Sequence, residues 1–164
     1  MKQNLRRVLA ALFLAGAAAA AHAQPAPGVT ARISDGSRTA SFHTAGPHFV
    51  LRAGESLHPG IRPDFTAEFR GKLAVIRAGS YEFRAPCASI EIAGQPAAPG
   101  PVALGAGQQP FLVRYRRSAP EARLQVEWKS DNFGWEPIPP QLLLPEAEPD
   151  GEYYIAGLRL KHAY

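Results

Sequence analysis

Polar and apolar residues alternate along most of the chain after residue 28, in short segments that glycine and proline separate. The clearest segment covers residues 65–73, where Phe65, Ala67, Phe69 and Leu73 alternate with polar or charged residues. A period of two residues is typical of a β-strand that buries one face. Apolar residues do not recur at helical spacing in this region, and the 16 prolines and 15 glycines of the chain further disfavour helices. The pattern predicts an all-β protein.

Similar segments follow one another along the chain. Strands are expected at residues 29–33, 39–43, 48–52, 65–77, 81–84, 89–93, 100–104, 109–116 and 122–128. Their inward faces are expected to include Tyr81, Phe83, Ile90, Ile92, Leu124, Val126 and Trp128. Many short strands with turns about every eight to twelve residues are typical of a sandwich or a barrel. We predict an antiparallel, jelly-roll-like β-sandwich over residues 29–144, which a strap beginning at residue 137 closes. A tail over residues 145–164 is expected to pack on the sandwich or extend it.

The first 23 residues have a different composition. Three basic residues lie within the first seven positions, residues 8–21 are apolar and uncharged, and residues 21–23 read Ala-His-Ala, a cleavage pattern of small residues. A segment of this composition is typical of a secretory signal peptide. Its apolar run is shorter than the roughly 20 residues that span a bilayer, although an uncleaved anchor is the alternative. We predict cleavage after residue 23, a flexible leader at residues 24–28, and a periplasmic or extracellular location without membrane insertion after cleavage.

Charge gives little support to a nucleic-acid partner. The formal charge of the chain is +4, but three of its 18 basic residues lie in the predicted signal peptide. The rest of the chain has 15 basic against 14 acidic residues. The longest basic run after the predicted signal peptide is Arg116-Arg117. A nucleic-acid-binding surface normally concentrates many more basic residues, so we expect no such partner.

The order of the segments resembles the protective-antigen-type (PA-fourteen) domain, the β-sandwich of anthrax protective antigen and of flocculin-like adhesins. The resemblance covers roughly residues 64–144. The residues that carry it are Gly71, the Gly79-Ser80-Tyr81-Glu82-Phe83 run, Ile90 to Gly94, Ala106-Gly107, Arg114-Tyr115-Arg116, Trp128, and Ile138 to Leu142. It implies a non-catalytic binding module, with a glycan or another cell-envelope polymer as the ligand.

One part of the family's pattern is missing. Sugar-binding members of this family carry an Asp-Asp pair that chelates Ca²⁺, and the matching positions here are Pro86 and Cys87. The Asp of the following xDG turn is also replaced, by Ala93. Proline and cysteine side chains are not the hard oxygen ligands that Ca²⁺ prefers. We therefore expect no metal site, no cofactor, and any sugar binding to be independent of calcium.

Cysteine and histidine give no clear site. Cys87 is the single cysteine, so it has no internal disulfide partner, and we expect a free thiol that is buried as a small apolar group. A bridge to a partner protein is the alternative. His43, His48, His58 and His162 are not spaced like a zinc motif, and metal handling by a spatial cluster of them is a less favoured hypothesis.

The segment 129–137, KSDNFGWEP, is the candidate ligand site. It is expected to be a loop in which Asp131 and Asn132 form hydrogen bonds and Phe133 and Trp135 stack on a sugar ring. The alternative is structural, with the aromatic residues packing the strap on the core and the polar pair making a turn.

No catalytic residue is expected. The sequence has no GxSxG motif, and the carboxylates of Asp64 and Glu68, four residues apart on a strand, would be about 13 Å apart, too far for a glycosidase pair. We predict a non-enzymatic carbohydrate-binding or adhesion module. The alternative is an accessory domain that docks a protein partner such as an envelope cytochrome or a secreted hydrolase.

Overall fold

A computed structural model describes residues 26–146, 153–155 and 158–160 of the chain. The predicted signal peptide and the first two residues of the leader fall outside these residues, as does His162. Within the described residues the regular secondary structure is antiparallel β-strand, apart from one helical turn, the 3₁₀ turn η1, Pro140–Leu142. The predicted all-β class is confirmed.

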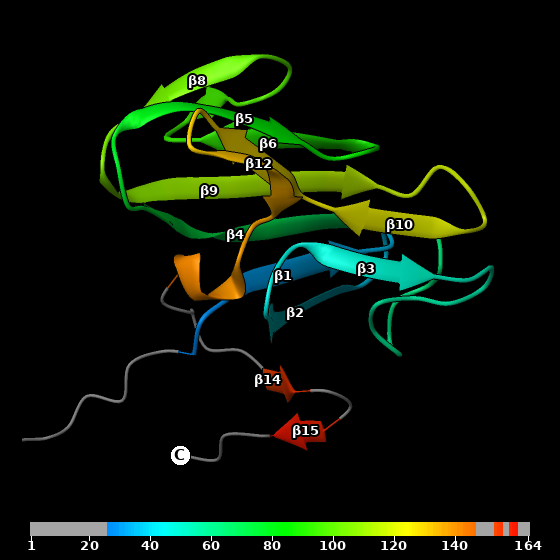
Figure 1. The fold of residues 1–164 in the computed structure, drawn as a ribbon. Helices are drawn as coiled ribbons and strands as arrows, with labels where there is room; N and C mark the ends of the chain where they lie inside the picture. The colour runs from blue at the N-terminus through cyan, green and yellow to red at the C-terminus, as the bar shows by residue number, and fades with distance from the viewer. Residues whose placement is uncertain (1–25, 147–152, 156–157, 161–164) are drawn as a thin grey trace, which may run out of the picture.

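The first layer of the sandwich is a seven-stranded sheet (Figure 1). Along it the strands follow the order β2, β1, β4, β9, β6, β7, and β13 also pairs with β4. The bounds are β1 Val29–Ser34, β2 Thr39–Thr44, β4 Thr66–Val75, β6 Ala88–Ile92, β7 Gln95–Pro96, β9 Gly107–Arg116 and β13 Leu143–Pro145. Strands β4 and β9 pair over their whole length, from Thr66 opposite Arg116 to Val75 opposite Gly107, and so form the centre of this layer.

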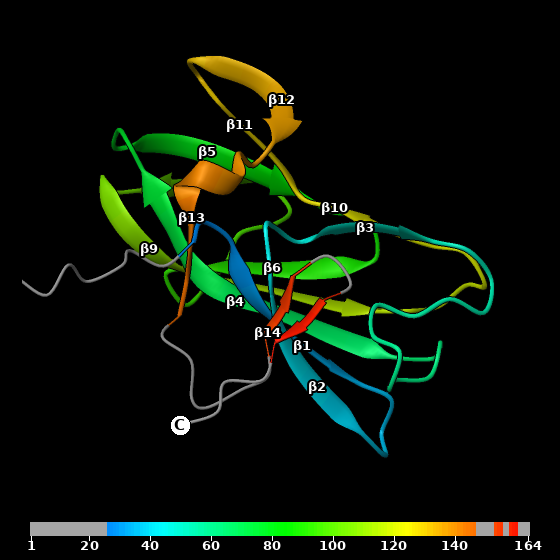
Figure 2. The same cartoon turned by 90° about the horizontal axis from the view of Figure 1, so that it is seen from below.

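The second layer consists of two shorter sheets that a single chain segment connects. One sheet pairs β3 with β10, and the other has the order β12, β11, β5, β8. The bounds are β3 His48–Leu51, β5 Gly79–Arg84, β8 Pro101–Leu104, β10 Ala122–Gln125, β11 Glu127–Ser130 and β12 Phe133–Pro137. Figure 2 shows β5, β10 and β3 on one side of β6, β4 and β1, which is the arrangement of a two-layer sandwich.

The core lies between the two layers and contains the alternate residues that the sequence pattern selects. Phe65, Phe69 and Leu73 are all buried, and so is each predicted inward residue of the strands at 81–84, 89–93 and 122–128. Aromatic rings join the layers, since Phe49 of β3 lies 6.3 Å from Phe65 and meets Tyr115 of β9 edge-on at 5.1 Å between ring centroids. Burial of side chains of this size is the main favourable term in folding.

The structure corrects three sequence predictions. The segment expected as one strand at residues 122–128 is two strands in different sheets, because the chain bends at Val126 between β10 and β11. The segment expected as a loop at residues 129–137 is a β-hairpin of β11 and β12. Glycine and proline predict a turn at Gly94-Gln95-Pro96, but the turn lies at Ala93 and Gly94, and Gln95 and Pro96 form the short strand β7, which pairs with β6.

The strap predicted from residue 137 passes through η1 and then becomes part of the first layer as β13. Leu143 lies opposite Leu73 and Pro145 lies opposite Gly71. A Cβ atom on Gly71 would lie 2.5 Å from the backbone oxygen of Leu144, a distance that real Cβ atoms do not adopt. Gly71 therefore allows the strap to approach β4 closely enough to pair with it.

The remaining described residues belong to the tail. They form a small antiparallel pair of β14, Tyr153–Ile155, with β15, Leu158–Leu160. Among the described residues, none forms a helix long and apolar enough to cross a bilayer.

Asp35 fixes the turn between β1 and β2 to a distant loop. Its Oδ1 atom accepts hydrogen bonds from the backbone N–H groups of Ser37 (2.9 Å) and Arg38 (2.8 Å) and from the Ser37 hydroxyl (2.7 Å). Its Oδ2 atom accepts one from the backbone N–H of Arg62 (3.0 Å). These donors, the Arg62 N–H first, hold the pKa of Asp35 well below its usual value because they stabilise the carboxylate.

Arg117 makes a second long-range connection, at the end of β9. It is the one charged residue among those described that is buried, with 8% of its surface exposed. Its guanidinium donates to backbone carbonyls rather than to a carboxylate, and it lies 5.9 Å from the centre of the Phe65 ring. The side chain therefore joins the end of β9 to the loop between β3 and β4.

Candidate functional site

The four residues predicted to bind a ligand lie in and around the β11–β12 hairpin. Asp131 and Asn132 form its exposed tip, where the Asn132 N–H donates to the Ser130 hydroxyl at 3.1 Å. Phe133 faces the core, with its ring centroid 5.1 Å from that of Trp128 and 6.4 Å from that of Tyr81. Phe133 therefore packs the hairpin on the sandwich.

Trp135 points to the opposite side of the sheet. The pairing register shifts between Trp128 and Ser130, because three residues of β12 span the distance that two residues cover on β11. This β-bulge breaks the alternation that would otherwise put Phe133 and Trp135 on one face. The hairpin therefore does not present the two aromatic rings to a common ligand.

Cations already occupy the neighbourhood of the Trp135 ring. The guanidinium carbon of Arg84 lies 4.3 Å from the ring centroid, and the Lys129 ammonium lies 5.1 Å from it. Both cations also pair across strands, Arg84 with Glu127 at 2.6 Å and Lys129 with Glu82 at 3.0 Å. The outer face of this sheet is therefore a network of cation–π contacts and ion pairs, and an incoming sugar would have to displace a cation to stack on Trp135.

Cys87 differs from its prediction in one respect. Its thiol is free, but the residue is exposed, so the expectation of a buried thiol is wrong. The reason is local, because Cys87 lies in the turn between β5 and β6, with a φ of 58°, and not in a strand that buries one face. It lies next to buried Tyr115, whose phenol has a raised pKa, first because of burial and then because of the nearby Cys87.

The turn at which the resemblance would place an Asp-Asp pair has different chemistry in this chain. Pro86 and Cys87 are both exposed and offer no carboxylate. Within the part of the chain that the structure describes, no group of three or more His, Cys, Asp or Glu residues is arranged to hold a metal ion.

The three histidines that the structure describes have different surroundings. His43 of β2 has a buried Nε2 atom without a hydrogen-bond partner among the described residues. His58 accepts the Gly60 N–H at 3.0 Å through Nδ1 and stacks on Phe42 at 6.4 Å. His48 is exposed at the start of β3, beside a pocket.

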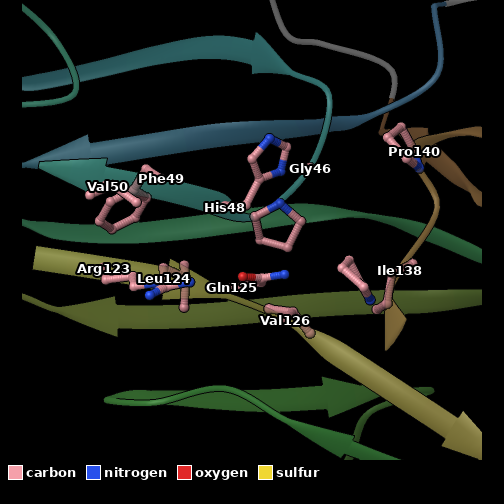
Figure 3. Close-up of a pocket in the computed structure, with 12 residues that line it drawn as sticks. Gly46, His48, Phe49, Val50, Arg123, Leu124, Gln125, Val126, Ile138 and Pro140 are labelled. Atoms are coloured by element: carbon pink, nitrogen blue, oxygen red, sulfur yellow. The ribbon is translucent and has the colours of Figure 1, made fainter. Parts of the chain in front are cut away.

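That pocket is a groove with a volume of about 370 Å³, between the β3–β10 pair and the closing strap (Figure 3). Residues 46–50 and 123–126 line it together with Pro137, Ile138 and Pro140. The strap is held beside it because the Ile138 N–H donates to the Val126 carbonyl at 3.3 Å. The groove is thus built by three separate segments, of which residues 46–50 are far from the other two in the sequence.

Two cross-strand pairs form the polar and apolar parts of the groove. His48 lies opposite Gln125, and Val50 lies opposite Arg123. Directly paired residues point to the same face, while Phe49 and Leu124 between them turn to the core. In Figure 3 the imidazole of His48 lies beside Gly46, and the amide of Gln125 lies on the side of Ile138.

Sequence reasoning missed this groove, although one residue signals it. Val50 is 74% exposed, which makes it one of only two large apolar residues that are so exposed among the described residues. An apolar residue on the solvent face of a strand, beside the polar positions 48, 123 and 125, indicates a binding surface.

Comparison with known proteins identifies the fold. No protein-family model and no curated protein sequence matches this chain. Among solved structures, an anti-sigma factor domain-containing protein from Clostridium clariflavum superimposes with a TM-score of 0.66 at 18% identity, over 76% of this chain and 48% of that one. The chain spans about half the length of that protein, and likewise half of a second anti-sigma factor domain-containing protein.

Three further similarities are to proteins with PA14, or protective-antigen-type, domains. The PA14 domain of the MpAFP antifreeze protein has a TM-score of 0.58 at 13% identity, over 74% of this chain and 93% of that one. The PA14 sugar-binding domain of an RTX adhesin has a TM-score of 0.52 at 15% identity, over 73% and 99%. The transport component C2-II of the Clostridium botulinum C2 toxin matches at 0.59 and 15%, over 74% and 28%. These structures confirm that the sandwich is PA14-like.

Proposed function

We propose that this PA14-like sandwich is a non-catalytic binding module that holds a carbohydrate of the cell envelope in the groove between β3, β10 and the strap. The groove is the observation on which the proposal rests. Its volume of about 370 Å³ falls within the range of small-molecule sites, roughly 300–1,000 Å³. The sugar-binding domain of the RTX adhesin shares the fold, which supports the ligand class by analogy only.

The chemistry of the groove suits a sugar ring. A pyranose has an apolar face and a rim of hydroxyl groups, and it needs both kinds of contact. Val50 and Pro47 provide apolar surface, while the Gln125 amide provides both a donor and an acceptor, and the His48 imidazole one more polar contact. This arrangement needs no metal, in agreement with Pro86 and Cys87 at the positions of the calcium-binding pair.

The same lining argues against catalysis in the groove. None of the described residues that line it carries a carboxylate, a hydroxyl or a thiol. Hydrolysis of a glycosidic bond normally uses two carboxylates, and His48 is a single group that cannot fill both roles. We therefore assign the groove to binding.

A glycan array tests the proposal with matched variants. The purified protein is expected to bind a subset of envelope glycans, with or without EDTA. Gln125→Ala and Val50→Lys are expected to lower the signal at least tenfold, because each removes one of the two kinds of contact. Gln108→Ala is the control, since Gln108 is an exposed amide on β9 that does not line the groove.

Two results would refute this assignment. One is the absence of any glycan signal for a folded protein, which would favour a protein partner instead. The other is binding that Gln125→Ala and Val50→Lys leave unchanged, which would place the ligand elsewhere, with Trp135→Ala as the next variant to measure.

The exported location is part of the same proposal. It rests on the basic and apolar composition of residues 1–23. Expression of the full chain in a Gram-negative host should yield a periplasmic or secreted protein whose N-terminal sequence begins at Gln24. A cytoplasmic protein that retains residue 1 would contradict it.

A further inference from the structure

A second open cavity of about 370 Å³ lies at the other end of β3 from η1, on the loop that leads into β4. Its lining comes from residues 54, 56 and 58–63 of that loop and from Arg38, in the turn between β1 and β2. The polar side chains among them are Arg38, Ser56, His58 and Arg62. It shares no lining residue with the groove between β3, β10 and the strap.

The charge in this cavity is not balanced by carboxylates. Arg38 donates from Nη1 to the Gly60 carbonyl at 3.1 Å, and it belongs to none of the ion pairs formed by the described residues. Arg62 lies 3.4 Å from Asp35 Oδ2. Since Asp35 also receives four hydrogen bonds within its own turn and from the Arg62 N–H, it offsets one guanidinium at most, which leaves a positive excess.

The two acidic residues of the loop, Glu55 and Asp64, do not line the cavity. The Oε2 atom of Glu55 accepts the Arg52 N–H at 2.7 Å. The positive potential of like-charged groups in a concave surface attracts anions and raises their local concentration. The cavity therefore favours a negatively charged ligand.

An unpartnered hydroxyl lies in the same lining. The Oγ atom of Ser56 is buried, and it has no hydrogen-bond partner among the described residues. A buried polar atom without a partner costs free energy, and an acceptor bound in the cavity would remove that cost. The hydroxyl is therefore a second and independent indication of a ligand rich in oxygen acceptors.

We infer that this cavity binds an oxyanion, to which the Arg38 guanidinium and the Ser56 hydroxyl donate hydrogen bonds. The carboxylate of a uronic acid and a sulfate ester both present this chemistry. A guanidinium suits either group because its N–H donors match pairs of oxygens. The inference concerns a different cavity from the proposed carbohydrate groove and does not depend on it.

Nuclear magnetic resonance titration of the exported, processed protein tests the inference. Sodium sulfate and sodium glucuronate are added separately at constant ionic strength, with glucose as the uncharged probe. The backbone amide signals of Gly54, Ser56 and Gly60 are expected to shift with one or both anions and not with glucose. The arm with the higher affinity identifies the preferred anion.

Two variants and a control separate a ligand site from a structural feature. Arg38→Gln is expected to weaken anion binding about tenfold, as the loss of a charge-assisted hydrogen bond does. Ser56→Ala is expected to weaken it several-fold without lowering the melting temperature, because the hydroxyl has no partner in the free protein. Arg77→Gln, which removes an exposed guanidinium outside the cavity, should leave binding unchanged.

The inference is overturned if neither anion shifts these amide signals. It is also overturned if Arg38→Gln binds either anion as well as the wild type. Anion binding without any signal on the glycan array would support this site and refute carbohydrate binding in the groove. The two proposals can therefore fail separately.

Discussion

Replacing Arg117 by alanine removes five hydrogen bonds at once. The guanidinium has five N–H donors, and each has one acceptor here. Nε donates to the Ala119 carbonyl at 3.1 Å, Nη1 donates to those of Pro63, at 3.1 Å, and Glu55, and Nη2 donates to those of Arg52, at 2.8 Å, and Pro120. All acceptors are neutral carbonyls, so the side chain acts through geometry and not through ion pairing.

The cost of this change follows from the number of donors lost. A net value of about 1 kcal/mol per hydrogen bond gives roughly 5 kcal/mol for Arg117→Ala. Water can reach some of the carbonyls, because Arg117 lines an open cavity with Pro63 and Pro120, so we expect about 3–5 kcal/mol. Arg117→Lys keeps three donors, and the loss of two bonds should cost about 2 kcal/mol.

Urea denaturation at pH 7 and 25 °C measures both values. Arg116→Ala is the matched control, because Arg116 is an exposed neighbour on β9, and it should change the free energy of unfolding by less than about 0.5 kcal/mol. The reasoning is refuted if Arg117→Lys is as stable as the wild type, or if Arg116→Ala costs as much as Arg117→Ala. Equal losses for alanine and lysine would also contradict a mechanism based on the number of donors.

Three further predictions concern the fold around the sites. Gly71→Ala should destabilise the protein by about 1–3 kcal/mol in the same denaturation assay, because its Cβ would collide with the Leu144 carbonyl; an unchanged midpoint would show that the strap does not pair with β4. The depressed pKa of Asp35 stabilises the folded state above the pKa of an unfolded aspartate, about 3.9, and this contribution is lost as pH falls below that value. The melting temperature of the wild type should therefore exceed that of Asp35→Asn at pH 7, and the gap should narrow below about pH 4; a gap that is constant down to pH 2 would contradict the role of the carboxylate. Cys87 should react with a thiol reagent such as DTNB in the native protein as fast as in urea, to within about tenfold, because it is exposed; reaction only after unfolding would show that the thiol is covered.

The alternation of apolar residues predicted the sandwich because burial on one face of a strand is a local property. Phe65, Phe69 and Leu73 needed no knowledge of their partners to be placed in the core, since a period of two residues selects them. The same reasoning worked for the other long strand, β9, which was expected at residues 109–116 and covers Gly107–Arg116. Pairing partners and the division into sheets were not accessible in this way.

The candidate sites were less predictable because they depend on contacts between distant segments. The opposite orientations of Phe133 and Trp135 come from a bulge that depends on the register with β11, which the sequence of the hairpin does not specify. The groove brings His48, Gln125 and Ile138 together only after three separate segments have folded. In the sequence, Arg117 is one of two adjacent basic residues. Its role in joining β9 to the loop between β3 and β4 is apparent only from its five carbonyl acceptors in the structure.

The strap has a consequence for how this sandwich connects to other chains. The Gly28 N–H donates to the Leu143 carbonyl at 2.8 Å, so the chain enters and leaves the sandwich at one place on its surface. A domain with adjoining ends can be inserted into a surface loop of a host protein, or circularly permuted, without a long linker. A permutant that joins residues 28 and 143 through a short linker and opens at the exposed turn around Ile76 should retain the core and both cavities.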